Sequence, residues 1–431
     1  MIKRANWGAV AVSLGLVALT GCAVGGGNGG GSGGGSGSGD DVTLSLLTFE
    51  TPNLTASYWD DIIARTSAKV PGVKIKKLVA PSAEQRNEYT RQLDSTGALP
   101  DIMVAIDPAG LAEGGKLAQF SEKELADWTS PTANSFNGRI YQLPTNSQTW
   151  QIYYRKADFE KAGITTPPKK WDDLLAAVDK LKAAQIKPFV IGGGAPDGLG
   201  PRWTFAQLVA DEVYAKDPKW LDKLTAGKTD FSDPLFVNAA TKMKALAGKE
   251  NVDNLSATYA QAQEAFLKGK GAMYPMGSWF PAAPDKAQQK EFGAFPMPTQ
   301  DGSLVLPVYT GGGLSVSAKS PDVAKAKQWA IEFSKLNADG GARYDGLFAA
   351  LKGYKPPAGL PPLYNTTLDL YEKAQAGGTV TPSFGNESGV PALPSGFIPK
   401  VDAALNDLLN GRADVDKFVA TLNTKFKELA K

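Results

Sequence analysis

Side chains that carry nucleophilic catalysis or bind metals are scarce in this sequence of 431 residues. The absence of histidine excludes Ser–His–Asp catalysis, histidine general bases and most zinc sites. No GxSxG motif, Walker A lysine or dinucleotide-binding fingerprint occurs, because the glycine-rich stretch 192–200 continues as Pro-Arg-Trp. We therefore expect a protein that is not an enzyme and that holds no metal and no cofactor. A glycoside hydrolase needs only two carboxylates across a cleft, so that alternative stays open.

The single cysteine, Cys22, follows a predicted export signal. Lys3 and Arg4 precede an apolar stretch, WGAVAVSLGLVALT, that is too short and too interrupted by glycine for a permanent membrane helix. The sequence LTGC that ends at Cys22 resembles a bacterial lipobox, in which the signal is cut before the cysteine and the thiol receives a diacylglyceryl group. We expect residues 1–21 to be a signal peptide and Cys22 to be a lipid anchor on the extracytoplasmic face of the cell membrane.

Charge and length limit what the mature chain can be. Removal of residues 1–21 takes away two basic and no acidic side chains, which leaves a formal charge of zero and nothing to attract nucleic acid. With one cysteine, no intramolecular disulfide can form. We expect residues 22–39 to be a lipidated cysteine followed by a Gly/Ser tether. The roughly 390 residues that remain exceed what one core usually organises, so two lobes are expected.

Predicted strands and helices alternate after the tether. The pattern reads as a strand at 42–49, a helix through 59–63, a strand at 73–79, a helix at about 83–94 and a strand at 101–106. This order predicts an open parallel sheet, in which ligands gather beyond the carboxyl ends of the strands. Those ends hold Glu50, the stretch 82–85 and Asp107.

Two later segments are expected to cross between the lobes. The first is a short strand, a Pro-Thr-Asn break and a second strand within 138–155, and the second is the run Gly311–Gly313, where backbone freedom is greatest. Asp233 should cap a helix that starts with proline, and Ser320 should cap another. Residues 415–429 have the apolar spacing of an amphipathic helix.

Short motifs follow one another in a specific order over most of the mature chain. They are GALPDI (97–102), NGRIYQLPTN (137–146), TW (149–150), YYRK (153–156), AG (162–163), KWDDL (170–174), FSDP (231–234), FLKGKGAM (266–273), GSW (277–279) and GGGLSV (311–316). Their order resembles the family 1 sugar-binding group of extracellular solute-binding proteins of ABC importers, of which maltose-binding protein is a member.

The resemblance implies an α/β, two-lobed periplasmic-binding-protein fold. Each lobe would be a mainly parallel sheet flanked by helices, and hinge strands would join the lobes. A carbohydrate would be captured in the cleft, and the closed, monomeric form would dock on the permease subunits of the importer. On this reading lobe one comprises residues 40–144 and 313–358, and lobe two comprises 145–312 and 359–431.

A sugar site needs an aromatic platform for the apolar face of a pyranose and polar groups for its hydroxyl edge. The resemblance implies that Trp279, at the turn after a strand, is the platform. Trp150 beside the first crossing and Trp203 after a glycine loop are further candidates. Trp171, Trp220 and Trp329 have the spacing of core residues or open a helix, and we expect them to be structural. The remaining ligand-binding candidates are Glu50, Gln85, Asp107, Asn146, Tyr309, Arg343, Phe384 and Asn386.

Most of the polar candidates have a structural alternative. Asp107 stands before a proline and could equally cap a helix, and Arg343 could form a salt bridge instead of reaching a hydroxyl. The candidate loops are acidic or rich in amides, which favours a neutral disaccharide or oligosaccharide. A sugar or polyol phosphate would instead require arginines and helix N-termini that converge on the cleft.

Overall fold

The computed structural model describes residues 41–430 except 84, 137, 195–198, 249–250, 254, 386–392 and 395. The predicted signal peptide, Cys22 and the tether up to residue 39 lie outside the described residues, and so does Asn386. None of the described helices is both long enough and apolar enough to cross a membrane.

The first sheet combines the amino-terminal strands with one late strand. Its order is β12-β3-β1-β2, and its strands are β1 (Val42–Thr48), β2 (Val73–Val79), β3 (Ile102–Val104) and β12 (Leu314–Val316). β1 runs parallel to β2 and β3, while β12 runs antiparallel to β3. The predicted parallel arrangement of the three amino-terminal strands is confirmed.

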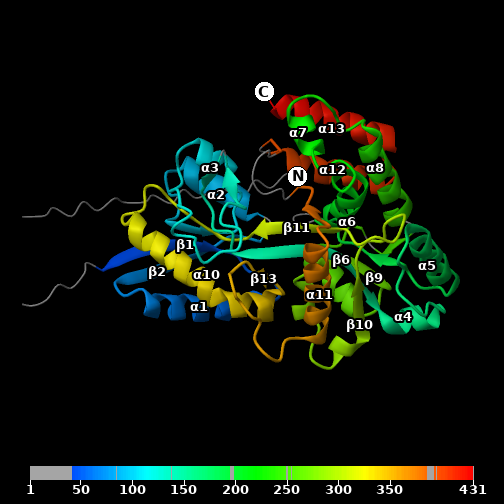
Figure 1. Cartoon of the computed structure of the whole chain (residues 1–431), viewed down its shortest axis with the longest axis horizontal. Coiled ribbons are helices and arrows are strands. Elements are labelled where there is room, and N and C mark those ends of the chain that lie inside the picture. The colour runs from blue at the N-terminus through cyan, green and yellow to red at the C-terminus, as the bar shows by residue number, and fades with distance from the viewer. Residues whose placement is uncertain are drawn as a thin grey trace, which may run out of the picture. The chain divides into compact units, whose positions relative to one another are not determined.

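Helices cover both faces of this sheet because buried side chains of β1 point to both. The helices are α1 (Ala56–Lys69), α2 (Arg86–Ser95), α3 (Ala109–Glu113) and α10 (Val323–Asp345), and they surround the first sheet in Figure 1. Leu44 and Leu46 pack in one core with Trp329, while Leu47 packs in a second core with Leu111. This division follows from the alternation of side chains along a strand.

The second sheet is larger and centres on one long strand. Its main order is β14-β11-β6-β9-β7-β8, with β10 and β13 also paired to β6. Its strands are β6 (Asn146–Arg155), β7 (Phe189–Val190), β8 (Val252–Asp253), β9 (Met273–Gly277), β10 (Phe292–Phe295), β11 (Leu306–Gly311), β13 (Phe348–Ala349) and β14 (Val380–Pro382). β6 is antiparallel to β9, β10, β11 and β13, whereas β7 is parallel to β8 and β9, and β11 to β14. The second sheet is therefore mixed, which differs from the mainly parallel sheet expected.

Helices of the second lobe enclose the largest apolar core. They are α4 (Lys156–Lys161), α5 (Trp171–Ala183), α6 (Gly200–Val209), the π-helix η1 (Ala210–Tyr214), α7 (Trp220–Thr225), α8 (Pro234–Ala247), α9 (Tyr259–Leu267), α11 (Pro362–Ala376), α12 (Phe397–Leu409) and α13 (Val415–Leu429). Shorter elements are the strands β4 (Ser135–Phe136) and β5 (Arg139–Ile140) and the 3₁₀ turns η2 (Phe280–Ala282) and η3 (Gln288–Glu291). Trp171, Trp220 and Trp329 are buried in the cores, as predicted.

The two helix caps predicted from sequence had different outcomes. The Asp233 carboxylate accepts a hydrogen bond from the Leu235 backbone N–H at 2.9 Å, so this cap is confirmed. The cap expected at Ser320 is wrong. α10 starts two residues later, because the Asp322 carboxylate accepts a hydrogen bond from the Lys325 N–H at 2.9 Å and so satisfies a free donor of the first turn.

The two crossing segments lie against each other. A Cβ on Gly313 would stand 1.8 Å from the Leu143 carbonyl oxygen, so only glycine fits there. The Leu143 N–H donates to the Leu314 carbonyl at 3.1 Å, and the Ala105 N–H donates to the Gly313 carbonyl at 2.9 Å. The chain passes from the second sheet in β11 to the first sheet in β12 at this glycine run. The residue boundaries of the two lobes stay a prediction.

Candidate functional site

Three tryptophans and a tyrosine from four different elements form an aromatic cluster: Trp150 of β6, Trp203 of α6, Tyr259 of α9 and Trp279 after β9. The Trp279 ring meets Trp203 edge-on with centroids 5.2 Å apart, and it meets Trp150 edge-on at 6.2 Å. Its indole Nε1 donates a hydrogen bond to the Tyr259 hydroxyl at 3.1 Å. These contacts fix the plane of the Trp279 indole.

Only Trp279 among the three tryptophans keeps a partly exposed ring. Trp150 is 2% exposed and Trp203 is 7% exposed, so both support Trp279 from the side. Gly277 makes room for the indole, because a Cβ there would stand 2.0 Å from the Trp279 ring. The structure thus brings the three predicted tryptophans together, with Trp279 partly exposed and Trp150 and Trp203 buried.

The turn that carries Trp279 touches the first lobe. The Asn53 side-chain amide donates to the Trp279 carbonyl at 3.5 Å. Gly346, which directly follows α10, has a φ of +53°, and a Cβ on it would lie 2.1 Å from the Ser278 carbonyl oxygen. Both the left-handed backbone and the close approach require glycine at this position. Trp279 therefore lies where the two lobes meet.

Three predicted polar residues lie near the carboxyl ends of the strands of the first sheet. Glu50 follows β1, Gln85 precedes α2 and Asp107 follows β3, and all three side chains are exposed. The Asp107 carboxylate accepts a hydrogen bond from the Ala109 N–H at 3.0 Å. This contact supports the structural alternative for Asp107, since its carboxylate binds the first turn of α3.

The other predicted ligand-binding residues lie on or next to other elements, and their exposure varies. Asn146 is buried on β6, and the Tyr309 hydroxyl accepts a hydrogen bond from the Gly312 N–H at 3.3 Å. Arg343 is exposed and donates to the Ala358 carbonyl at 3.4 Å. Phe384, also a predicted ligand contact, has its ring fully buried in the core of the second lobe, 5.6 Å from the ring of Phe205.

Two charged residues at this junction were missed by the sequence analysis. The Arg86 guanidinium donates to the carbonyls of Ala83 and Ala105, and it lies 4.8 Å from the centroid of the Phe49 ring. Burial raises the pKa of Asp345, the last residue of α10, to about 7, and the positive charge of Arg86 opposes that rise.

Electrostatic interactions also link the two lobes at this junction. Burial raises the pKa of the Tyr309 phenol, whereas the charges of Arg86 and Asp107 act on it in opposite directions. Tyr309 belongs to the second sheet, while Arg86 starts α2 and Asp107 follows β3, a strand of the first sheet. The weak sequence signal for Arg86 was its place beside Gln85, but Asp345 ends a helix whose spacing indicated only packing.

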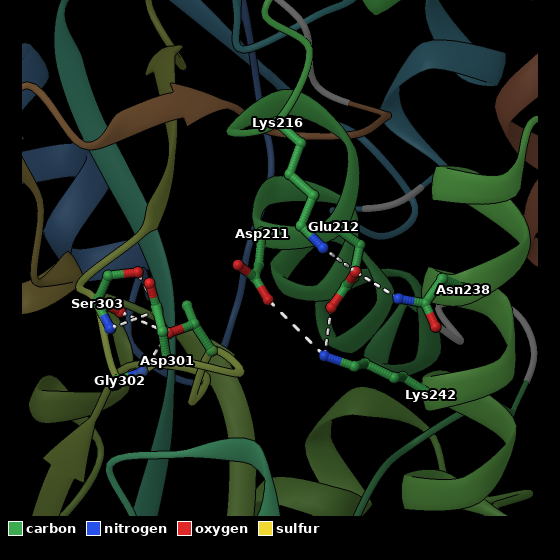
Figure 2. A network of polar contacts seen from close by, with 9 residues as sticks. Asp211, Glu212, Lys216, Asn238, Lys242, Asp301, Gly302 and Ser303 are labelled. Carbon is green, nitrogen blue, oxygen red and sulfur yellow. Dashed lines mark hydrogen bonds and ion pairs between the residues drawn. The ribbon is translucent and has the colours of Figure 1, made fainter.

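A separate polar network lies inside the second lobe, between η1 and α8 (Figure 2). Glu212 is buried and accepts hydrogen bonds from Lys216 and Asn238, each at 2.5 Å, and from Lys242. Although burial acts to raise the pKa of Glu212, the two lysines hold it below its ordinary value.

The pKa of Asp211, in the same network, is shifted in the opposite direction to that of Glu212. The Asp211 carboxylate is 3.9 Å from the Lys242 ammonium, and burial together with the Glu212 charge raises its pKa to about 6. In a nearby loop (Figure 2), hydrogen bonds from Ser303 and Thr299 lower the pKa of Asp301 to about 2. These carboxylates are already hydrogen-bonded or near a lysine, so we interpret the contacts as structural. No group of described side chains could hold a metal ion.

The two α/β lobes have the periplasmic-binding-protein fold. The solved structure of a chitin oligosaccharide binding protein is similar to this chain, with a TM-score of 0.78 and 24% identity over 91% of this chain and 100% of that one. The structure of maltose-bound T. maritima MalE3 is also similar, with a TM-score of 0.70 and 18% identity over 90% of this chain and 99% of that one. The chain belongs to the bacterial extracellular solute-binding protein family, whose model matches residues 51–333.

Curated relatives agree with this family. The multiple sugar-binding protein of Streptococcus mutans is 25% identical over 232 residues, which are 52% of this chain and 54% of that protein. The probable sugar-binding periplasmic protein of Mesorhizobium japonicum is 26% identical over 369 residues, or 77% and 78%. The match thus spans about half the length of the first relative and about four fifths of the second.

Proposed function

We propose that this chain is the substrate-binding component of an ABC importer and that it captures a neutral carbohydrate between its lobes. The observation that carries the proposal is the geometry of Trp279. Its ring is partly exposed, fixed by Trp203, Trp150 and Tyr259, and placed on a turn that touches the first lobe. An indole held in this way offers a flat apolar surface for the C–H face of a pyranose.

Polar groups of the first lobe would serve the hydroxyl edge of the sugar. Glu50 and Gln85 are exposed beside the sheet edge and can accept hydrogen bonds from hydroxyl groups. A sugar that contacts both lobes would favour the closed state, because the open state lacks one set of contacts. The names of the relatives, which refer to sugars, support the same ligand class.

A sugar or polyol phosphate is the second candidate ligand. One relative, the sn-glycerol-3-phosphate-binding periplasmic protein of Rhizobium meliloti, is 27% identical over 181 residues, or 39% of each chain. Arg86 is a cation at the junction, but its guanidinium already donates to two carbonyls and lies over Phe49. The acidic side chains Glu50 and Asp345 would repel a phosphate, so a neutral ligand is favoured.

The location and the partners of the protein are proposed from sequence and family. Cys22 would anchor the mature chain to the outer face of the cell membrane, and the Gly/Ser tether would let the monomeric lobes reach the permease. Metabolic labelling with a radioactive fatty acid tests the anchor: label should enter the wild type and not a Cys22→Ser variant. Equal labelling of both would contradict it.

A thermal-shift screen tests the ligand class. Residues 40–431 would be heated with N,N′-diacetylchitobiose, xylobiose, maltose, raffinose and glycerol 3-phosphate, and ligand at 100 times its Kd should add about 2.7 kcal/mol of stability. A shift with glycerol 3-phosphate and none with a neutral sugar would contradict the proposal. The same incubations, assayed for new reducing ends, test the hydrolase alternative, and we expect no product.

A further inference from the structure

The carboxyl group of Asp345 lies at the junction of the lobes, next to Arg86 and Tyr58 of the first lobe. Asp345 is the last residue of α10 and precedes Gly346, whose Cα packs against the Ser278 carbonyl and the Trp279 backbone. The backbone of Asp345 is therefore one residue away from the turn that presents the aromatic platform. Its side chain is partly buried, and no described residue donates a hydrogen bond to its carboxylate.

The groups around Asp345 leave its charge only weakly compensated. Arg86 on α2 is the cation that acts on it, yet that guanidinium donates to the Ala83 and Ala105 carbonyls. Tyr58 on α1 donates its hydroxyl to the Asn337 side chain at 2.5 Å, and burial raises the pKa of this phenol well above the neutral range. Arg343, on α10 like Asp345, donates a hydrogen bond to the Ala358 carbonyl.

We infer that Asp345 contacts the ligand, its carboxylate accepting a hydrogen bond from a hydroxyl group of a carbohydrate bound on Trp279. This inference rests on the proposed function. A partly buried carboxylate is hydrated less well than a free one, and a ligand hydroxyl would supply a donor that the described residues do not. A carboxylate accepts only, so it selects ligand atoms that carry hydrogen and rejects a phosphate.

Ligand binding should then be coupled to proton release. With a pKa of about 7, the Asp345 carboxyl is about half protonated at pH 7 in the free protein. The ionised form accepts the stronger hydrogen bond, so binding at pH 7 should release up to about half a proton. The ionised fraction rises from about one tenth at pH 6 to about nine tenths at pH 8, so affinity should rise about tenfold over this range. Tyr58 and Arg86 keep their protons over the same range.

Titration calorimetry on the full chain tests this inference with the neutral sugar that raises the melting temperature most in the panel above. The variants are Asp345→Asn and, as a control, Asp339→Asn, an exposed position on the same helix that accepts a hydrogen bond from Tyr354 at 2.9 Å. We expect the wild type and the control to bind about tenfold more tightly at pH 8 than at pH 6. Asp345→Asn should bind at least tenfold more weakly at pH 8 and show no pH dependence.

Measurements on the wild type alone keep the test independent of the folding of the variant. Calorimetry at pH 7 in two buffers of different ionisation enthalpy should report release of about half a proton. No proton release, or an Asp345→Asn variant that binds with the affinity and pH profile of the wild type, would overturn the inference and leave the proposed function intact. Absence of binding by any neutral sugar to the wild type would overturn both.

Discussion

Replacement of Trp279 by alanine should separate ligand binding from stability. The partly exposed indole is held by Trp203, Trp150 and Tyr259, so its loss removes a platform that is fixed in the free protein. Burial of about 60 Å² of apolar sugar surface contributes about 1.5 kcal/mol, and tryptophans at the centre of interfaces often cost more than about 2 kcal/mol when truncated. We therefore expect a loss of about 2–3 kcal/mol, which is about 30- to 150-fold in Kd.

The same change should have a smaller effect on the fold. Truncation of a fully buried tryptophan costs about 3–5 kcal/mol, and Trp279 is only partly buried, so about 1–2 kcal/mol is expected. Calorimetry would measure affinity, and urea denaturation would measure the free energy of unfolding. Trp329→Phe is the matched control, because Trp329 is fully buried in the first lobe. This substitution should lower the free energy of unfolding without a change in Kd. A Trp279→Ala variant that binds within twofold of the wild type would refute the platform.

Three other substitutions test the surroundings of the site and the core. Gly277→Ala would place a methyl group 2.0 Å from the Trp279 ring, so calorimetry should show at least tenfold weaker binding; unchanged binding would mean that the ring position does not matter. Gly346→Ala meets the Ser278 carbonyl at 2.1 Å with a φ of +53°, and should lower the free energy of unfolding in urea by about 2 kcal/mol or more; a loss below 0.5 kcal/mol would contradict the close packing. Because the folded-state pKa of Asp211 is raised to about 6, its contribution to stability is full below about pH 4 and is lost as the pH rises through 6. The stability of Asp211→Asn relative to the wild type should thus increase between pH 4 and pH 7 in urea titrations, and a constant difference would contradict the assignment.

Elements with a strong local signal were predicted from the sequence. The alternation of VKIKKLV gave β2 with the bounds that the structure has, and the apolar spacing of residues 415–429 gave α13. Both signals depend on side chains close together in the chain. The strand direction in the second sheet is set by how β6 meets four other strands, and no local pattern records that.

The candidate site was predicted in part for the same reason. Trp150, Trp203 and Trp279 came from motifs and their positions after strands or loops, and the structure gathers them. Phe384 lies in a loop-like stretch, TPSFGNESG, yet its ring is buried, because residues far away in sequence close over it. Asp345 was missed because its environment depends on α2 and on the turn after β9, more than 60 residues away.

The contact between Gly313 and Leu143 has a mechanical consequence. Two separate connections between lobes could twist independently, which would allow the lobes to shear as well as to rotate. Here the Gly313 α-carbon packs on the Leu143 carbonyl, and the Leu143 N–H donates a hydrogen bond to the Leu314 carbonyl at 3.1 Å. We therefore expect these two connections to move together as the lobes close. A side chain at position 313 would push the two connections apart. It should therefore change how the lobes close, although position 313 is distant from the ligand.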